Sequence, residues 1–172
     1  VVARYAMRSL RDSGYMTGRA SEATFWQVLD QALRSRADMA AFRAALIAAS
    51  RPRDAVLCLA AALRELGWRT AVLSDHTDWL DEIETRTPFG SAFGQVRNSY
   101  YTGSIKAQPE AFEAALAALG VAPEHAVFAD DNPRNVSVAA GCGLQAVHWD
   151  ADGWAALGAR LAACGVPAAL LR

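Results

Sequence analysis

The sequence predicts an α/β fold in which helices cover both faces of a parallel sheet, preceded by a small all-helical segment. Two observations predict this class: helical spacing alone fills residues 1–50, whereas short apolar runs alternate with helical patterns in residues 51–172. Strands that alternate with helices in this way form parallel sheets, because each crossover helix packs back onto the sheet. We therefore expect a helical cap over residues 1–50 and an α/β core over residues 51–172.

Composition narrows the class of protein. With 172 residues, 53% of them apolar, the chain can bury one sizeable core. The formal net charge of −1 and the lack of a basic, aromatic-rich run argue against nucleic acid or an anionic membrane as partner. No apolar stretch is long enough to span a bilayer, and no signal-peptide pattern opens the chain. The three cysteines lack metal-ligand spacing, so we expect them to be small core residues of a cytoplasmic protein.

Three helices are predicted in the N-terminal segment. Apolar residues keep helical spacing near residues 2–10, and Ser21 is the predicted N-cap of a second helix. A third helix carries apolar positions from Met39 to Ile47. No strand pattern occurs in this segment.

The rest of the chain alternates between strands and helices. A helix follows Pro52 and ends before Gly67, and the run TAVLSD (residues 70–75) predicts a strand buried on both faces. The later elements are a helix, a loop at TPFGSAFG (87–94), a weak strand near residues 95–98, the helix QPEAFEAALAALG (108–120), the strand AVFADD (126–131), a helix from about residue 133, the strand QAVHW (145–149) and a helix near residues 155–164.

Polar residues follow two of these strands and precede one helix. Ser74 and Asp75 close TAVLSD, Lys106 precedes a helix, and Asp130 and Asp131 close AVFADD. Each feature alone has an ordinary explanation, such as a helix cap or a solvated lysine. Together, at the strand ends where ligands bind in such sheets, they predict Mg²⁺ on the aspartates and phosphate oxygens on the hydroxyl and the lysine. A positive partner is also what adjacent carboxylates require.

The motifs LSD, Lys106 and VFADDNPRNVSVAAGCGLQAVHW resemble motifs two, three and four of the haloacid dehalogenase (HAD) superfamily, over about residues 53–149. GRASEATFW resembles the helical cap that subgroups insert after their first strand. This resemblance implies a Rossmann-like HAD core. Most members are Mg²⁺-dependent phosphatases that act through an aspartyl-phosphate, and some are dehalogenases.

Carried over by position, the resemblance implies a role for each site residue. Ser74 would bind the transferring phosphoryl group, and Lys106 would neutralise it and the nucleophile. Asp131, with Asp130 beside it, would hold Mg²⁺. Asn135 matches a position that often carries a supporting polar residue, and we count it among the substrate-binding residues.

The sequence departs from the family pattern at two important places. Asp75, which we also count among the substrate-binding residues, stands where the family often has Asn, so a third carboxylate is expected near an anionic substrate and would weaken its binding. The family's first motif, a strand ending in Asp-x-Asp that supplies the nucleophile, has no counterpart before the cap. Asp12 and Asp30 lie in helical patterns. The chain as given is therefore expected to lack its first core strand and its nucleophile.

The missing strand predicts a gap in the sheet. In the family it lies between the strands that correspond here to TAVL and AVFA, so two open edges would face each other about 10 Å apart. Buried unpaired N–H and C=O groups cost roughly 1–3 kcal/mol each, so we expect the gap to be filled. The candidates are an upstream segment, a strand from another subunit of a homo-oligomer, re-pairing of the two strands, or recruitment of VVARYAM at the N-terminus.

Two hypotheses of function follow. The leading one is a HAD-like hydrolase, by descent an Mg²⁺-dependent phosphatase of a small-molecule phosphate ester, which needs its first strand from elsewhere. The alternative is a catalytically inactive HAD-like binding or assembly module. An in-frame apolar run with Asp-x-Asp upstream of Val1 would support the enzyme, and a stop codon would support the module.

Overall fold

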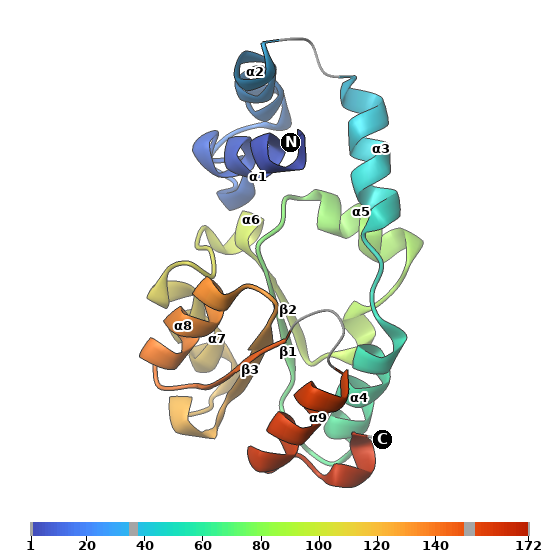
Figure 1. Ribbon diagram of the computed structural model, residues 1–172, viewed down its shortest axis with the longest axis vertical. Helices are drawn as coiled ribbons and strands as arrows, with labels where there is room; N and C mark the ends of the chain where they lie inside the picture. The colour runs from blue at the N-terminus through green and yellow to red at the C-terminus, as the bar shows by residue number, and fades with distance from the viewer. Residues whose placement is uncertain (1, 35–37, 150–153, 172) are drawn as a thin grey trace.

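A computed structural model describes residues 2–34, 38–149 and 154–171, and its order of elements confirms the predicted α/β class (Figure 1). The main elements are α1 (Val2–Asp12), α2 (Glu22–Leu33), α3 (Met39–Ala49), α4 (Asp54–Glu65), β1 (Ala71–Ser74), α5 (Trp79–Arg86), β2 (Gln95–Asn98), α6 (Ser99–Thr102), α7 (Pro109–Leu119), β3 (Val127–Asp130), α8 (Pro133–Gly141), β4 (Gln145–His148) and α9 (Trp154–Ala163). Short 3₁₀ turns are η1 (Tyr15–Thr17), η2 (Gly90–Ala92), η3 (Pro123–His125) and η4 (Ala168–Leu170). The division into cap and core at residue 50 stays a prediction.

The four strands found in the described residues form two parallel pairs. β1 pairs with β2, and β3 pairs with β4, each over four residues. Within the described residues no hydrogen-bonded ladder joins β1 to β3. Re-pairing of the strands TAVL and AVFA, one of the expected ways to close the gap, is therefore wrong for this structure.

The open edge of β3 can be assigned from its hydrogen bonds. The carbonyl groups of Ala126 and Asp130 both accept a backbone N–H from the β4 side, at 2.9 Å. Because successive residues of a strand point to opposite edges, Val127 and Ala129 direct their N–H and C=O groups away from β4. That edge has no strand partner in the part of the chain that is described.

β1 has the same arrangement. The carbonyl of Thr70 accepts a backbone N–H from the β2 side at 3.0 Å, so Ala71 and Leu73 lie on the open edge. All four residues of β1 are half-buried. The prediction that TAVLSD is buried on both faces is therefore wrong here: all its residues keep partial exposure, and with one paired neighbour among the described residues β1 is an edge strand, which is covered less than a central one.

The N-terminal segment is helical as its spacing predicts, and Ser21 caps α2 by accepting the N–H of Thr24 at 3.3 Å. Recruitment of VVARYAM as a strand is wrong, since residues 2–12 form α1. The side chains of Ala6 and Leu10 on α1 are buried in a cluster that also includes residues of α2, α3 and α5.

A second apolar cluster packs α9 against β4. Its buried members include Val147 and Leu157, and Leu59 and Leu63 of α4 pack against it. The cysteines do not take part as predicted: Cys58 is exposed, whereas Cys142 and Cys164 are only half-buried, and all three are free thiols. The expectation that the cysteines are core residues is wrong. The two buried clusters are filled by other side chains, among them leucine, valine and aromatic residues.

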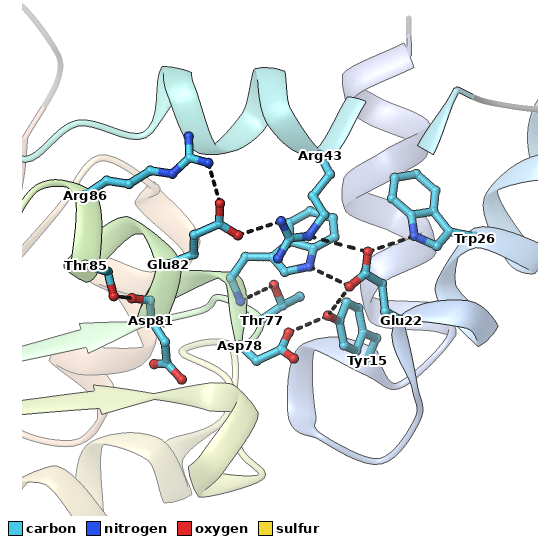
Figure 2. A network of polar contacts seen from close by, with 11 residues as sticks. Tyr15, Glu22, Trp26, Arg43, Thr77, Asp78, Asp81, Glu82, Thr85 and Arg86 are labelled. Carbon is cyan, nitrogen blue, oxygen red and sulfur yellow. Dashed lines mark hydrogen bonds and ion pairs between the residues drawn. The ribbon is translucent and has the colours of Figure 1, made fainter. Parts of the chain in front are cut away.

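Glu22 of α2 is the centre of a polar network between the N-terminal helices and α5 (Figure 2). Its carboxylate accepts the indole N–H of Trp26 at 3.0 Å and that of Trp79 at 3.1 Å, and it lies 3.6 Å from the guanidinium of Arg43. The Tyr15 hydroxyl donates to Asp78 and lies 3.4 Å from Oε2 of Glu22. Burial, followed by the hydrogen bond to Asp78, raises the pKa of Tyr15, so its hydroxyl stays protonated at neutral pH.

Arg43 of α3 extends this network. Its guanidinium pairs with Glu82 of α5 at 2.5 Å (Figure 2). It also lies 5.5 Å from the ring centre of Trp79. α1, η1, α2 and α3 are thus tied to α5, the helix that follows β1. No helix among the described residues is long and apolar enough to cross a membrane.

Gly18 makes a close approach that only glycine allows. Its φ is +65°, and a Cβ there would lie 2.3 Å from the carbonyl oxygen of Tyr100 in α6. We expect Gly18→Ala to destabilise the protein by more than the roughly 1–3 kcal/mol that a strained φ alone costs. Urea unfolding measures the difference. Gly67→Ala is the matched control, because Gly67 has a φ of +84° but no atom within 4 Å of the place where a methyl group would lie. Equal losses in the two variants would contradict this packing.

Candidate functional site

Lys106 lies between the two strand pairs and contacts the end of each. Its backbone N–H donates to Oδ1 of Asp75, which follows β1, at 2.8 Å. Its Nζ donates to Oδ2 of Asp130, the last residue of β3, at 2.6 Å. The side chains of Lys106 and Asp130 are only 16% and 6% exposed. This ion pair is therefore largely shielded from water. In such a shielded position, two charges attract each other more strongly than they do at the surface.

Asp130 is positioned by the turn between β3 and α8. Besides Lys106, its carboxylate accepts the backbone N–H of Asn132 at 2.8 Å and the side-chain amide of Asn135 at 3.0 Å. Asn132 is the N-cap of α8 and accepts the N–H of Arg134 at 3.0 Å, with Pro133 in the first helical turn. The negative charge thus has three donors, enough to satisfy a buried carboxylate.

Asp75 is the second carboxylate that contacts Lys106. Burial raises the pKa of Asp75, and the charge of Asp130 acts in the same direction. The hydrogen bond from the Lys106 N–H and the positive charges of Lys106 and Arg11 oppose that rise. Arg11 belongs to α1, so a charge from the N-terminal helices reaches the end of β1.

The predicted site residues divide into two groups. The structure brings Asp75, Lys106, Asp130 and Asn135 into direct contact, and Ser74 ends β1 beside them, half-buried. Asp131, by contrast, is exposed, and its backbone carbonyl pairs with Nε2 of His148 at 3.0 Å. The roles of these residues stay predictions.

Two buried polar residues support the site and were missed from the sequence. The Ser99 hydroxyl donates to the carbonyl of Met16 at 2.8 Å and accepts the N–H of His76 at 3.1 Å. The Asn98 amide donates to the carbonyl of Thr77 at 2.8 Å. They fix the loop after β1 against β2 and η1. Their signal in the sequence is the polar pair Asn98-Ser99 at the end of the weak strand near residues 95–98.

A further signal lies in the composition. Lys106 is the only lysine of the sequence, which has 16 arginines. All the remaining lysine or arginine positions carry arginine, and the one lysine is the residue that pairs with Asp130.

The donor set meets only part of what Mg²⁺ requires. Among the described residues no group of three or more His, Cys, Asp or Glu side chains is arranged around a common metal position. Mg²⁺ often uses one or two protein carboxylates and completes its shell with water and phosphate oxygens. Asp130 fits one such ligand position, and the remaining oxygens would come from water, phosphate or another segment.

A pocket of about 360 Å³ is lined mainly by residues 50–57, α5 and the loop before β2, together with Val72 of β1 and Trp149 just after β4. Leu57, Leu80 and Phe93 give it an apolar wall. The Nε1 of Trp149 is buried and has no hydrogen-bond partner among the residues that the structure describes. A buried donor without an acceptor costs roughly 1–3 kcal/mol, so an occupant that brings a carbonyl oxygen to Trp149 would stabilise the protein.

The buried ion pair predicts strong coupling between two substitutions. Lys106→Met leaves the Asp130 carboxylate buried without its cation, and such a loss costs roughly 3–5 kcal/mol. In an Asp130→Asn background the same change should cost far less, because no charge is left unpaired. A double-mutant cycle in urea unfolding measures this coupling. The matched control is the exposed pair of Arg8 and Asp12, 3.3 Å apart, for which little coupling is expected. Additive effects at Lys106 and Asp130 would contradict the geometry.

Solved structures share this fold. A HAD family enzyme from Bacteroides thetaiotaomicron matches with a TM-score of 0.72 and 20% identity over 90% of this chain and 81% of that chain. A predicted HAD-like family hydrolase from Porphyromonas gingivalis matches with a TM-score of 0.71 and 22% identity over 93% and 90%. The Bacteroides enzyme in complex with magnesium and inorganic phosphate matches with a TM-score of 0.69 and 19% identity over 91% and 88%. At these identities the likeness shows a shared fold.

The family follows from a second comparison. None of the curated proteins compared with the chain matches it. The family model of the haloacid dehalogenase-like hydrolases matches residues 4–143, which include the N-terminal helices, Lys106 and Asp130. The resemblance seen in LSD, Lys106 and VFADD is therefore confirmed, and this chain belongs to the haloacid dehalogenase-like hydrolase family.

Proposed function

We propose that this protein hydrolyses the phosphate monoester of a small molecule with the help of Mg²⁺. The observation that carries the proposal is Lys106, held between Asp75 and Asp130 at the carboxyl ends of β1 and β3. A shielded ammonium beside a buried carboxylate suits a phosphoryl group and its metal ion, because the two ligands bring opposite charges. The Bacteroides relative of the same fold, solved with magnesium and inorganic phosphate, supports this chemistry.

Each residue has a definite task in this proposal. The Ser74 hydroxyl and the Lys106 ammonium bind phosphoryl oxygens. Asp130 is a ligand of Mg²⁺, with Asp131 beside it, and the Asn135 amide keeps the Asp130 carboxylate oriented. Bound Mg²⁺ would supply positive charge to the phosphoryl oxygens during transfer.

The reaction also needs a nucleophile, and we propose that it enters on a strand that fills the gap between β1 and β3. Three observations on the described residues support this: β1 and β3 each have one edge without a paired strand, Val72 of β1 and Trp149 after β4 line the same apolar pocket, and the Nε1 of Trp149 has no acceptor. A carboxylate at the end of that strand would attack phosphorus in line and form an acyl phosphate, while the P–O bond to the alcohol breaks and the leaving oxygen takes a proton from water. Water would then hydrolyse the acyl phosphate and release inorganic phosphate. The strand would come from upstream of residue 1 or from another subunit.

Substitution of Asp130, the last residue of β3, and of Asp131, which follows it, tests the proposed roles of these two carboxylates. With the native protein and p-nitrophenyl phosphate, Asp130→Asn should lower Mg²⁺-dependent hydrolysis at least about a hundredfold, because a ligand and the partner of Lys106 are both lost. Asp131→Asn should cause a smaller loss, because Asp131 is exposed and does not pair with Lys106. Equal losses in both variants, or hydrolysis that needs no Mg²⁺, would contradict these roles.

The intact mass of the native protein decides between the enzyme and the inactive module. A mass above 18.4 kDa together with Mg²⁺-dependent hydrolysis would support an enzyme whose first strand lies upstream. A mass of 18.4 kDa with hydrolysis would place the strand in another subunit. A mass of 18.4 kDa without hydrolysis would favour a binding or assembly module, in which the open edges serve to pair with another protein.

A further inference from the structure

Asp75 is the carboxylate that the proposed reaction does not use. We propose that it is a positioning residue, whose Oδ1 anchors the backbone of Lys106 to the end of β1 so that the ammonium reaches Asp130 on β3. The inference rests on the proposed function, because it explains how the phosphate-binding lysine is placed.

The geometry fixes Lys106 at both ends. Its backbone nitrogen lies 2.8 Å from Oδ1 of Asp75, and its Nζ lies 2.6 Å from Oδ2 of Asp130. Because no ladder joins β1 to β3 in the described residues, these two contacts connect the strand pairs through one residue. A shift of the Lys106 backbone would therefore move the ammonium away from Asp130.

The loop around Lys106 is held elsewhere by weaker or more local contacts. Ile105 donates its N–H to the Gln108 side chain at 3.1 Å, and Gln108 donates its N–H back to Ile105 at 2.9 Å. Arg19 donates to the carbonyl of Gly103 at 3.3 Å. None of these three contacts connects the loop to β1. The hydrogen bond from the Lys106 N–H to Asp75 does.

Anchoring needs an acceptor oxygen and does not need a negative charge. The charged groups that act on Asp75 are Lys106, Arg11 of α1 and Asp130. An asparagine would keep Oδ1 in place and remove the charge, while alanine would remove both. The two substitutions therefore separate the positioning role of Asp75 from its electrostatic effect on an anionic ligand.

The experiment uses Lys106 as its own reporter. Lys106 is the only lysine, so its side chain and the α-amino group are the two amines of this chain that an acylating reagent can label. Mass spectrometry with peptide mapping then follows the labelling of Lys106. In the folded chain, Asp75→Asn should label at Lys106 within about twofold of the parent rate. Asp75→Ala should label roughly tenfold faster, because the anchored and shielded state becomes less populated. Asp54→Ala, which removes an exposed carboxylate in the first turn of α4, is the matched control and should label like the parent.

Equal labelling of the Asn and Ala variants would overturn the inference. If Asp75→Ala does not fold, hydrogen exchange at the Lys106 amide in the parent and in Asp75→Asn replaces it. Slow exchange in both supports the anchor, and fast exchange in either overturns it.

Binding of inorganic phosphate in the presence of Mg²⁺ tests the link to the proposed function. Asp75→Asn should bind phosphate roughly three- to tenfold more tightly than the parent, since a nearby like charge is removed. Asp75→Ala should bind phosphate more weakly than Asp75→Asn, because the alanine variant lacks the oxygen that holds the Lys106 backbone in position. Equal binding by these two variants would overturn the positioning role. If no variant binds phosphate but the labelling rates differ as expected, the proposed function fails and the anchor stands.

Discussion

Among the described residues no ladder joins the two strand pairs, and Lys106 connects their carboxyl ends. β1 with β2 and β3 with β4 form separate parallel pairs, and Lys106 joins them through Asp75 on one side and Asp130 on the other. The ion pair is buried, so it stays strong only while both partners keep their hydrogen bonds. The carboxyl ends of the strands, where a ligand would bind, are therefore brought together by the same lysine that is expected to bind the ligand.

The N-terminal helices are fixed relative to this site by packing and by a polar network. Tyr15, Glu22 and Arg43 connect them to α5, which begins a few residues after Ser74 (Figure 2). Gly18 lies against Tyr100 of α6, the helix that directly precedes the loop carrying Lys106. Because Arg11 of α1 acts on Asp75, these helices also contribute charge to the site. Their position is thus part of the electrostatics of the site as well as of the fold.

The sequence predicted the order of the strands and helices and the gathering of polar residues at one end of the sheet. Apolar runs mark buried strands, and parallel strands end at a common edge, so Asp75, Lys106 and Asp130 were expected to be neighbours. It did not predict which of the two adjacent aspartates is buried, since that depends on the turn into α8. Nor did it predict the half-burial of β1 or the bond between Asp75 and the Lys106 backbone. Both depend on contacts between segments far apart in the chain, which local periodicity does not encode.

The open edges of β1 and β3 are tested most directly by hydrogen exchange of their backbone amides in this chain, residue by residue. We expect alternating protection along β3: the amides of Phe128 and Asp130 face β4 and exchange slowly, whereas those of Val127 and Ala129 face the gap and exchange quickly. Neighbouring amides of one strand serve as controls for each other, since they share the same local stability. Uniform slow exchange through residues 127–130 would show that β3 has a strand on both sides, and would contradict the gap that Lys106 bridges.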